Sequence, residues 1–166
     1  TQGTYLSLYH GTYPYCTSKD VCASAVCSDI GLGPTRVSDV TIVFKSFVTR
    51  VGEGELPGQL GREEILKRRW MEYGTVTGRE RRAAPFNFDL ARRAVMLNGA
   101  TQIAITKIDL IAPKAASVRR FQKLPDEAKD FVRKIEDETG RPVVLIGTGP
   151  STWDIIDRRK TPHGKS

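Results

Sequence analysis

The 166-residue sequence contains few cysteines and no long apolar run. Cys16, Cys22 and Cys27 are too few for a disulfide framework, and their spacing does not fit a two-pair zinc site, so we expect buried thiols in a reducing compartment. No stretch approaches the roughly 20 apolar residues of a membrane-spanning helix. The first twenty residues also lack the apolar core of a signal peptide. These absences favour a cytoplasmic protein with no membrane partner.

The sequence also lacks a glycine-rich loop ending in Gly-Lys, which binds phosphates in many nucleotide-binding proteins. Positive charge, in contrast, is abundant. Lys+Arg 26 against Asp+Glu 19 gives a formal net charge of +7. This excess favours anionic partners, either nucleic acid or small phosphorylated ligands, although a basic surface without such a partner remains a third interpretation.

Apolar and β-branched residues predict three strands, at residues 40–48 (VTIVFKSFV), 101–108 (TQIAITKI) and 142–147 (PVVLIG). The last two flank a predicted helix, a connection long enough for parallel pairing. Apolar strands of this kind are typical of a sheet covered on both faces. We therefore predict an α/β fold with a mostly parallel sheet flanked by helices.

Helices are predicted over residues 63–73, 89–98 and about 125–139, each followed by a glycine. Pro125 and the acidic residues after it are favourable in the first turn of the third helix. Glycine and hydroxyl residues predict loops with short helical or extended pieces elsewhere, at residues 1–36, 49–58 and 74–84.

In open parallel sheets, ligands bind beyond the carboxyl ends of the strands. Lys107, Ile108 and Asp109 follow one predicted strand, and residues 148–150 follow the next. A carboxylate such as Asp109 can accept hydrogen bonds from both N1–H and the amine of guanine, while the stem of Lys107 lies along the base. The alternative is a solvated strand end that binds nothing.

Two loops concentrate groups that could bind anions. Residues 74–82 (GTVTGRERR) place Arg79 and Arg81 on the same side of an extended chain, where their guanidinium groups could bind carboxylate or phosphate. The alternatives are a basic surface loop or a nucleic-acid contact, but no aromatic ladder for base stacking accompanies it. Residues 11–18 (GTYPYCTS) could hold a phosphate or form an ordinary packed turn.

Together, and in this order, these segments resemble the adenylosuccinate synthetase family. The similar segments span nearly the whole chain and are residues 2–4 (QGT), 10–15 (HGTYPY), 49–52 (TRVG), 74–82, 106–109 (TKID) and 147–150 (GTGP). The resemblance implies a P-loop-NTPase-like fold and GTP-dependent ligation of IMP and L-aspartate to adenylosuccinate, with release of GDP and phosphate. It also implies a Mg²⁺ cofactor, a homodimer and no nucleic-acid partner.

The resemblance further implies roles for particular residues. Gln2 contacts the 6-oxygen of IMP, Thr17 holds the IMP phosphate region, and Arg79 meets the IMP ribose and the aspartate. The residues of the loop that closes on aspartate are Thr75, Val76, Thr77, Gly78, Arg79, Glu80 and Arg81, the last also near GTP. The residues expected at guanine are Lys107, Ile108, Asp109, Gly147, Thr148 and Gly149.

On this resemblance, the chain corresponds to the C-terminal half of a compact, archaeal-like enzyme. Residues 1–84 carry the IMP and aspartate loops, residues 85–159 carry the guanine-binding strand–helix–strand unit, and residues 160–166 form a flexible tail. The phosphate-binding loop, the catalytic acid and base, and the Mg²⁺ ligands are expected in an N-terminal half, so the isolated chain is expected to be inactive. The alternative function, a basic non-catalytic nucleic-acid-binding module, rests on the +7 charge and residues 79–82.

Overall fold

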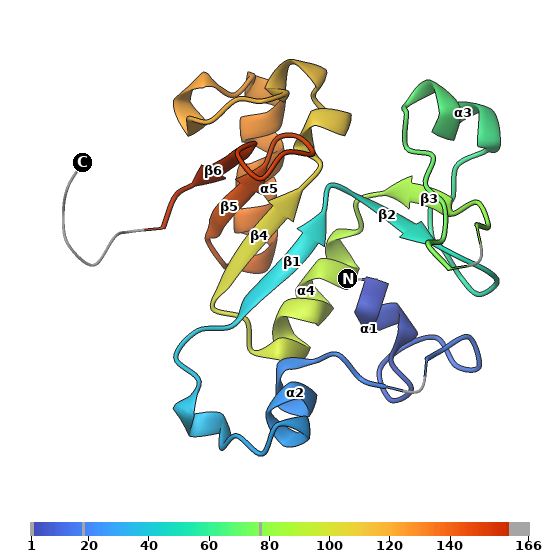
Figure 1. Cartoon of the computed structure of the whole chain (residues 1–166), viewed down its shortest axis with the longest axis vertical. Coiled ribbons are helices and arrows are strands. Elements are labelled where there is room, and N and C mark those ends of the chain that lie inside the picture. The colour runs from blue at the N-terminus through green and yellow to red at the C-terminus, as the bar shows by residue number, and fades with distance from the viewer. Residues whose placement is uncertain (1, 18, 77, 160–166) are drawn as a thin grey trace.

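A computed structural model describes residues 2–17, 19–76 and 78–159 (Figure 1). Over this part of the chain the strands form a four-stranded sheet and a separate two-stranded sheet. The larger sheet contains, in spatial order, β1 (Thr41–Lys45), β4 (Gln102–Thr106), β5 (Val143–Gly147) and β6 (Ile155–Asp157). The pairs β1–β4 and β4–β5 are parallel, whereas β5–β6 is antiparallel, which confirms the predicted mostly parallel sheet. The smaller sheet pairs β2 (Phe47–Arg50) antiparallel to β3 (Arg82–Pro85).

Two helices, α4 (Phe88–Asn98) and α5 (Asp126–Thr139), pack together against one face of the larger sheet (Figure 1). Asn87 caps α4, because its side-chain oxygen accepts a hydrogen bond from Leu90 N at 2.8 Å. Gly99 and Gly140 end the two helices in the left-handed conformation, with φ of 55° and 63°. Both predicted helices are therefore confirmed with their glycine stops.

The main core lies between this sheet and the two helices. Its fully buried side chains include Phe44 on β1, Ile103 and Ile105 on β4, and Val132 and Ile135 on α5. Ile103, Ala104 and Ile105 follow one another on β4 and are all buried, so this strand is covered on both faces. On β1, in contrast, alternate residues point away from the helices, and Val43 is 56% exposed.

The remaining described α-helices are short and lie in the first half of the chain. They are α1 (Gln2–Leu6), α2 (Ala23–Asp29) and α3 (Arg62–Lys67). All three cysteines are free thiols, and Cys22 and Cys27 are buried as predicted, whereas Cys16 is only partly buried. Within the described ranges, no helix is long and apolar enough to cross a membrane.

The strand predicted at residues 40–48 is wrong in one respect, because the chain bends at Ser46 and continues into the other sheet as β2. The amide of Ser46 donates to Thr106 O at 3.0 Å, and its hydroxyl donates to the carbonyl of Lys107 at 2.6 Å. Phe47 and Val48 remain buried after the bend because the second sheet has its own core. Apolar periodicity therefore continues through a change of sheet.

The helix predicted at residues 63–73 is also too long, because α3 ends at Lys67 and Arg69 has a positive φ of 59°. Trp70 is nevertheless 3% exposed: its ring stacks on Phe47 at 4.4 Å, and its indole N–H donates to Leu110 O at 3.1 Å. A helical spacing of apolar residues was thus produced by an irregular segment. The end of the loop predicted at residues 74–84 lies in β3, and β6 was not predicted.

Candidate functional site

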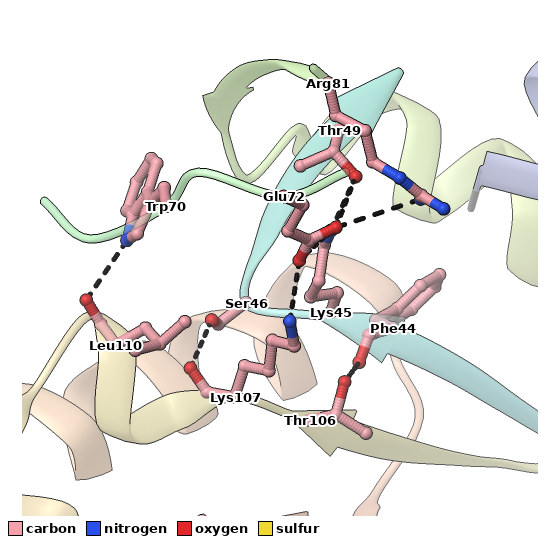
Figure 2. Close-up of polar contacts among 10 residues, drawn as sticks. All are labelled: Phe44, Lys45, Ser46, Thr49, Trp70, Glu72, Arg81, Thr106, Lys107 and Leu110. Carbon is pink, nitrogen blue, oxygen red and sulfur yellow. Dashed lines mark hydrogen bonds and ion pairs between the residues drawn. The ribbon is translucent and has the colours of Figure 1, made fainter. Parts of the chain in front are cut away.

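The chain beyond the carboxyl end of β4 is held in an unusual backbone conformation. Lys107 has φ of 62°, which costs a non-glycine residue about 1–2 kcal/mol. The hydrogen bond from the Ser46 hydroxyl to its carbonyl stabilises this conformation (Figure 2). A Cβ added at Gly147 would lie 3.9 Å from Lys107 N, so the ends of β4 and β5 meet here as predicted.

Glu72 lies at the centre of a group of polar side chains from four segments (Figure 2). Its Oε1 accepts from Lys107 Nζ at 2.7 Å, and Lys45 Nζ lies 2.9 Å from both carboxylate oxygens. Its Oε2 accepts from the Thr49 hydroxyl at 3.2 Å and lies 3.8 Å from the Arg81 guanidinium. We call Lys45, Thr49, Glu72, Arg81 and Lys107 the Glu72 cluster.

Burial and pairing shift the pKa values of two members of the Glu72 cluster. Burial lowers the pKa of Lys45 to about 8, although its hydrogen bond to Glu72 acts in the opposite direction. Burial acts to raise the pKa of Glu72, but hydrogen bonds from Lys107 and Lys45 outweigh it and hold that pKa below its usual value. Glu72 is therefore ionised at neutral pH.

The free energy of unfolding of the wild-type chain is expected to rise, relative to that of Lys45→Met, between about pH 8 and 10.5. Above pH 8 the folded state releases the Lys45 proton, whereas the unfolded chain keeps it up to the usual pKa of 10.5. The unfolded state thus binds more protons in this window, and stability increases with pH. Urea unfolding at pH 7, 8, 9 and 10 measures the difference, with the exposed Lys19→Met as the matched control. A difference that does not change with pH would contradict the assignment.

The Glu72 cluster lines a cavity of about 420 Å³. Lys45, Arg81 and Lys107 bring three cations to one carboxylate, so the cavity favours an anion. Among the described residues, no group of three His, Cys, Asp or Glu could hold a metal ion. Because Glu72 is surrounded by cations, these residues do not fit the Mg²⁺ that the resemblance implies.

Asp109 lies in a different cavity from Lys107. It lines a space of about 730 Å³ together with Ser46, Trp70, Phe86 and Phe131. Its Oδ1 atom is buried and has no hydrogen-bond partner among the described residues. A buried acceptor without a partner is costly, so this atom is suited to receive a donor from a ligand. The two residues expected to share one guanine thus face different spaces.

The other residues expected at guanine are mostly committed to the fold. Ile108 is fully buried in the core, so its side chain is not available to a ligand. Thr148 is also fully buried, and its hydroxyl donates to Val118 O at 2.9 Å. A Cβ added at Gly149 would lie 2.5 Å from Asp154 Oδ2, which explains the glycine by close packing. Residues 147–149 could therefore contact a base only through their backbone atoms.

The predicted aspartate loop is closed at its base and exposed at its tip. Gly74 N donates to Arg79 O and Arg81 N donates to Glu72 O, both at 2.8 Å. Val76 at the tip of the loop is 95% exposed. Thr75, Gly78 and Arg79 are also exposed, whereas Thr77 lies outside the described residues.

Within this loop, Glu80 and Arg81 point to different neighbours. The Glu80 carboxylate is bound by both the Nε and Nη2 atoms of Arg62 at 3.1 and 2.9 Å, on the solvent side of α3. Arg81 is only partly exposed and faces the Glu72 cluster. Arg81 is therefore a loop side chain that the structure brings to the cavity lined by the Glu72 cluster.

The N-terminal segments expected at IMP lie beside residues 49–52. Arg50 is 3% exposed, and its guanidinium donates to Tyr15 O and Glu53 O, both at 2.9 Å. Thr17 is exposed and its amide donates to Leu6 O at 2.8 Å. Gln2 begins α1, but its side chain and residues 160–166 lie outside the described part of the chain.

A family model described as adenylosuccinate synthetase matches residues 1–115, which include both the Glu72 cluster and Asp109. The chain belongs to this family. Curated adenylosuccinate synthetases of Thermococcus onnurineus and Methanosphaera stadtmanae are 55% and 51% identical to it over 161 and 159 residues. These alignments cover 97% and 96% of this chain but 48% and 47% of the relatives. The chain thus spans about half the length of the curated relatives it matches.

Two solved structures share the fold of this adenylosuccinate synthetase family member. The first is the fully ligated adenylosuccinate synthetase of Plasmodium falciparum, with a TM-score of 0.87 at 24% identity. The match covers 94% of this chain and 48% of the Plasmodium chain. The second is a cyanophage S-2L succinoaminodeoxyadenylate synthetase bound to dGMP and dATP, with a TM-score of 0.69 at 24% identity. The match covers 95% of this chain and 44% of the cyanophage chain. These likenesses confirm the expected α/β fold.

Lys45 and Glu72 were missed by the sequence analysis, and Thr49, although part of the segment 49–52, was given no role. Lys45 carried a usable signal, because a lysine within an otherwise apolar strand requires a partner when it is buried. Glu72 carried none, because it lay in a predicted amphipathic helix where a glutamate is expected to face solvent. Its contacts with Thr49 and Lys107 join residues 23 and 35 positions apart in the sequence.

Proposed function

We propose that this chain supplies substrate recognition in a GTP-dependent adenylosuccinate synthetase, which joins IMP and L-aspartate and releases GDP and phosphate. The observation that carries the proposal is the family match over residues 1–115, with curated relatives more than 50% identical. Residues 1–84 would bind IMP and aspartate, and residues 85–159 would bind guanine. Strand β1 belongs to the first part by sequence and pairs with β4 of the second, so both parts share one sheet.

In the proposed reaction, the 6-oxygen of IMP attacks the γ-phosphate of GTP, and the aspartate amine then displaces the new phosphate from the purine. Gln2 would contact the 6-oxygen where negative charge develops. Arg79 would orient the aspartate carboxylates from the exposed loop, and Arg81 would bring positive charge to the space between aspartate and nucleotide.

Asp109 would select guanine. Its buried Oδ1 needs a donor, and guanine presents N1–H and an amine side by side. The aromatic rings of Trp70, Phe86 and Phe131 line the same cavity, whose volume of about 730 Å³ lies within the roughly 300–1,000 Å³ range of ligand sites. The backbone of residues 147–149 would lie beside the base.

The phosphoryl-transfer groups would lie in an N-terminal half. Mg²⁺ would be bound there, since the described residues of this chain do not fit it; when bound, it neutralises charge on the transferred phosphoryl group. From the family resemblance we also propose a cytoplasmic homodimer that does not bind nucleic acid. Sedimentation of the complete enzyme measures whether it is a dimer.

The test joins this chain to the N-terminal half of the Thermococcus onnurineus relative. We expect GDP release that requires both IMP and aspartate, and no turnover by the 166 residues alone. GDP release that is independent of either substrate would contradict the proposal, and turnover by the isolated chain would contradict the division of labour. Binding of this chain to a random oligonucleotide that weakens by orders of magnitude between roughly 50 and 200 mM salt would favour the nucleic-acid alternative.

A further inference from the structure

We propose that Glu72 is a positioning residue that holds Lys107 and Arg81 in one arrangement and thereby couples the nucleotide site to the aspartate loop. The proposal rests on the function proposed above and adds a residue that none of the recognised segments contains. Glu72 lies two positions before the loop of residues 74–82, and its own carbonyl accepts the amide of Arg81 at 2.8 Å. Both its backbone and its side chain therefore engage the loop.

The two carboxylate oxygens of Glu72 serve two sides of the cavity (Figure 2). Oε1 accepts from Lys107, which follows β4 in the guanine-binding unit. Oε2 accepts from Thr49 on β2 and faces Arg81 of the aspartate loop. Lys45 on β1 lies equally close to both oxygens and completes the bridge.

A negative charge at position 72 is required for this arrangement. Without it, two ammonium groups and a guanidinium would share a cavity of about 420 Å³, and their mutual repulsion would separate them. A glutamine would keep the size of the side chain but would lose the charge and replace one acceptor oxygen with an amide donor. Glu72 is itself only 17% exposed at its side chain, so solvent does not screen these contacts fully.

The bridge makes the position of Arg81 depend on Lys107. A nucleotide that contacts Lys107 in the position held by Glu72 changes how strongly Lys107 attracts the carboxylate, and this in turn changes how strongly the carboxylate attracts Arg81. Nucleotide binding is thus transmitted to the loop through one carboxylate. By linkage, aspartate binding at the loop must affect nucleotide affinity by the same factor.

The experiment measures Michaelis constants of the complete enzyme, built as above, for wild type and Glu72→Gln. We expect the constants for GTP and aspartate to rise and the constant for IMP to stay unchanged. We also expect the dependence of aspartate affinity on GTP concentration, typically 5- to 150-fold for coupled sites, to be lost. Glu64→Gln is the matched control, because its carboxylate binds Arg68 on the exposed side of α3 and does not reach the cavity.

A second variant keeps the test decisive if Glu72→Gln does not fold by circular dichroism. Lys107→Met removes the other end of the bridge and should raise the Michaelis constant for aspartate, a substrate that Lys107 is not proposed to touch. An unchanged aspartate constant in Lys107→Met, or an equal rise for all three substrates in Glu72→Gln, would overturn the proposal. Failure of the proposed function is distinct, because the wild type would then show no GDP release dependent on IMP and aspartate.

Discussion

Replacing Asp109 with asparagine is expected to weaken GTP binding by roughly 30- to 1000-fold, equivalent to about 2–4 kcal/mol. The buried Oδ1 atom of Asp109 has no partner among the described residues and would accept a donor from guanine. Asparagine removes the negative charge and places one donor opposite a donor of the base. The lost hydrogen bonds are charge-assisted and lie in a partly desolvated cavity, which makes the effect large.

The same substitution should reverse the base preference, because xanthine carries an oxygen where guanine has its amine. The Asp109→Asn enzyme should prefer xanthosine triphosphate over GTP, and the wild type should show the opposite order. Michaelis constants for both nucleotides, with saturating IMP and aspartate, measure this preference. Asp130→Asn on the exposed face of α5 is the matched control. If GTP remains preferred by the Asp109 variant, that residue is only a strand-end carboxylate.

Replacing Trp70 with alanine is expected to lower the free energy of unfolding by about 3–5 kcal/mol. The indole ring is 3% exposed, stacks on Phe47 at 4.4 Å and joins the segment after α3 to Leu110. The substitution leaves a cavity and removes this connection. Because Leu110 follows Asp109 directly, we also expect weaker GTP binding.

Two further variants separate the contributions of Trp70. Trp70→Phe keeps a stacked ring but loses the hydrogen bond to Leu110, and should cost only about 1 kcal/mol. Trp153→Ala removes an indole that is 73% exposed and should change stability by no more than about 0.5 kcal/mol. Urea denaturation of the chain measures all three. Equal effects of Trp70→Ala and Trp153→Ala would show that the stacked ring contributes little.

Local signals in the sequence were sufficient for much of the fold. Gly99 and Gly140 end their helices because each can adopt a positive φ at little cost, and this property is readable at one position. The strand–helix–strand order at residues 102–147 determines parallel pairing, because a crossover helix returns the chain to the same end of the sheet. The same order predicts that Lys107 and Gly147 lie at the same end of the sheet.

Segments whose conformation depends on contacts distant in the sequence could not be predicted in this way. The change of sheet at Ser46 depends on hydrogen bonds to Thr106 and Lys107, about sixty positions later in the chain. The apolar pattern does not record it, because burial continues on both sides of the bend. Trp70 likewise has the sequence spacing of a buried helix residue, but it lies outside α3 and is buried by contacts with Phe47 and Leu110.

Patterns along the chain were enough to indicate its family, the positions of its long helices and the strand ends that carry polar residues. The directions of those polar side chains, in contrast, depend on contacts between distant segments. The left-handed backbone at Lys107, held by Ser46, accompanies a turn that directs the lysine to Glu72 and leaves Asp109 in the neighbouring cavity. Side-chain direction at such a turn depends on hydrogen bonds and charges from distant segments. Lys107 and Asp109 can therefore face different sites although only one residue separates them in the sequence.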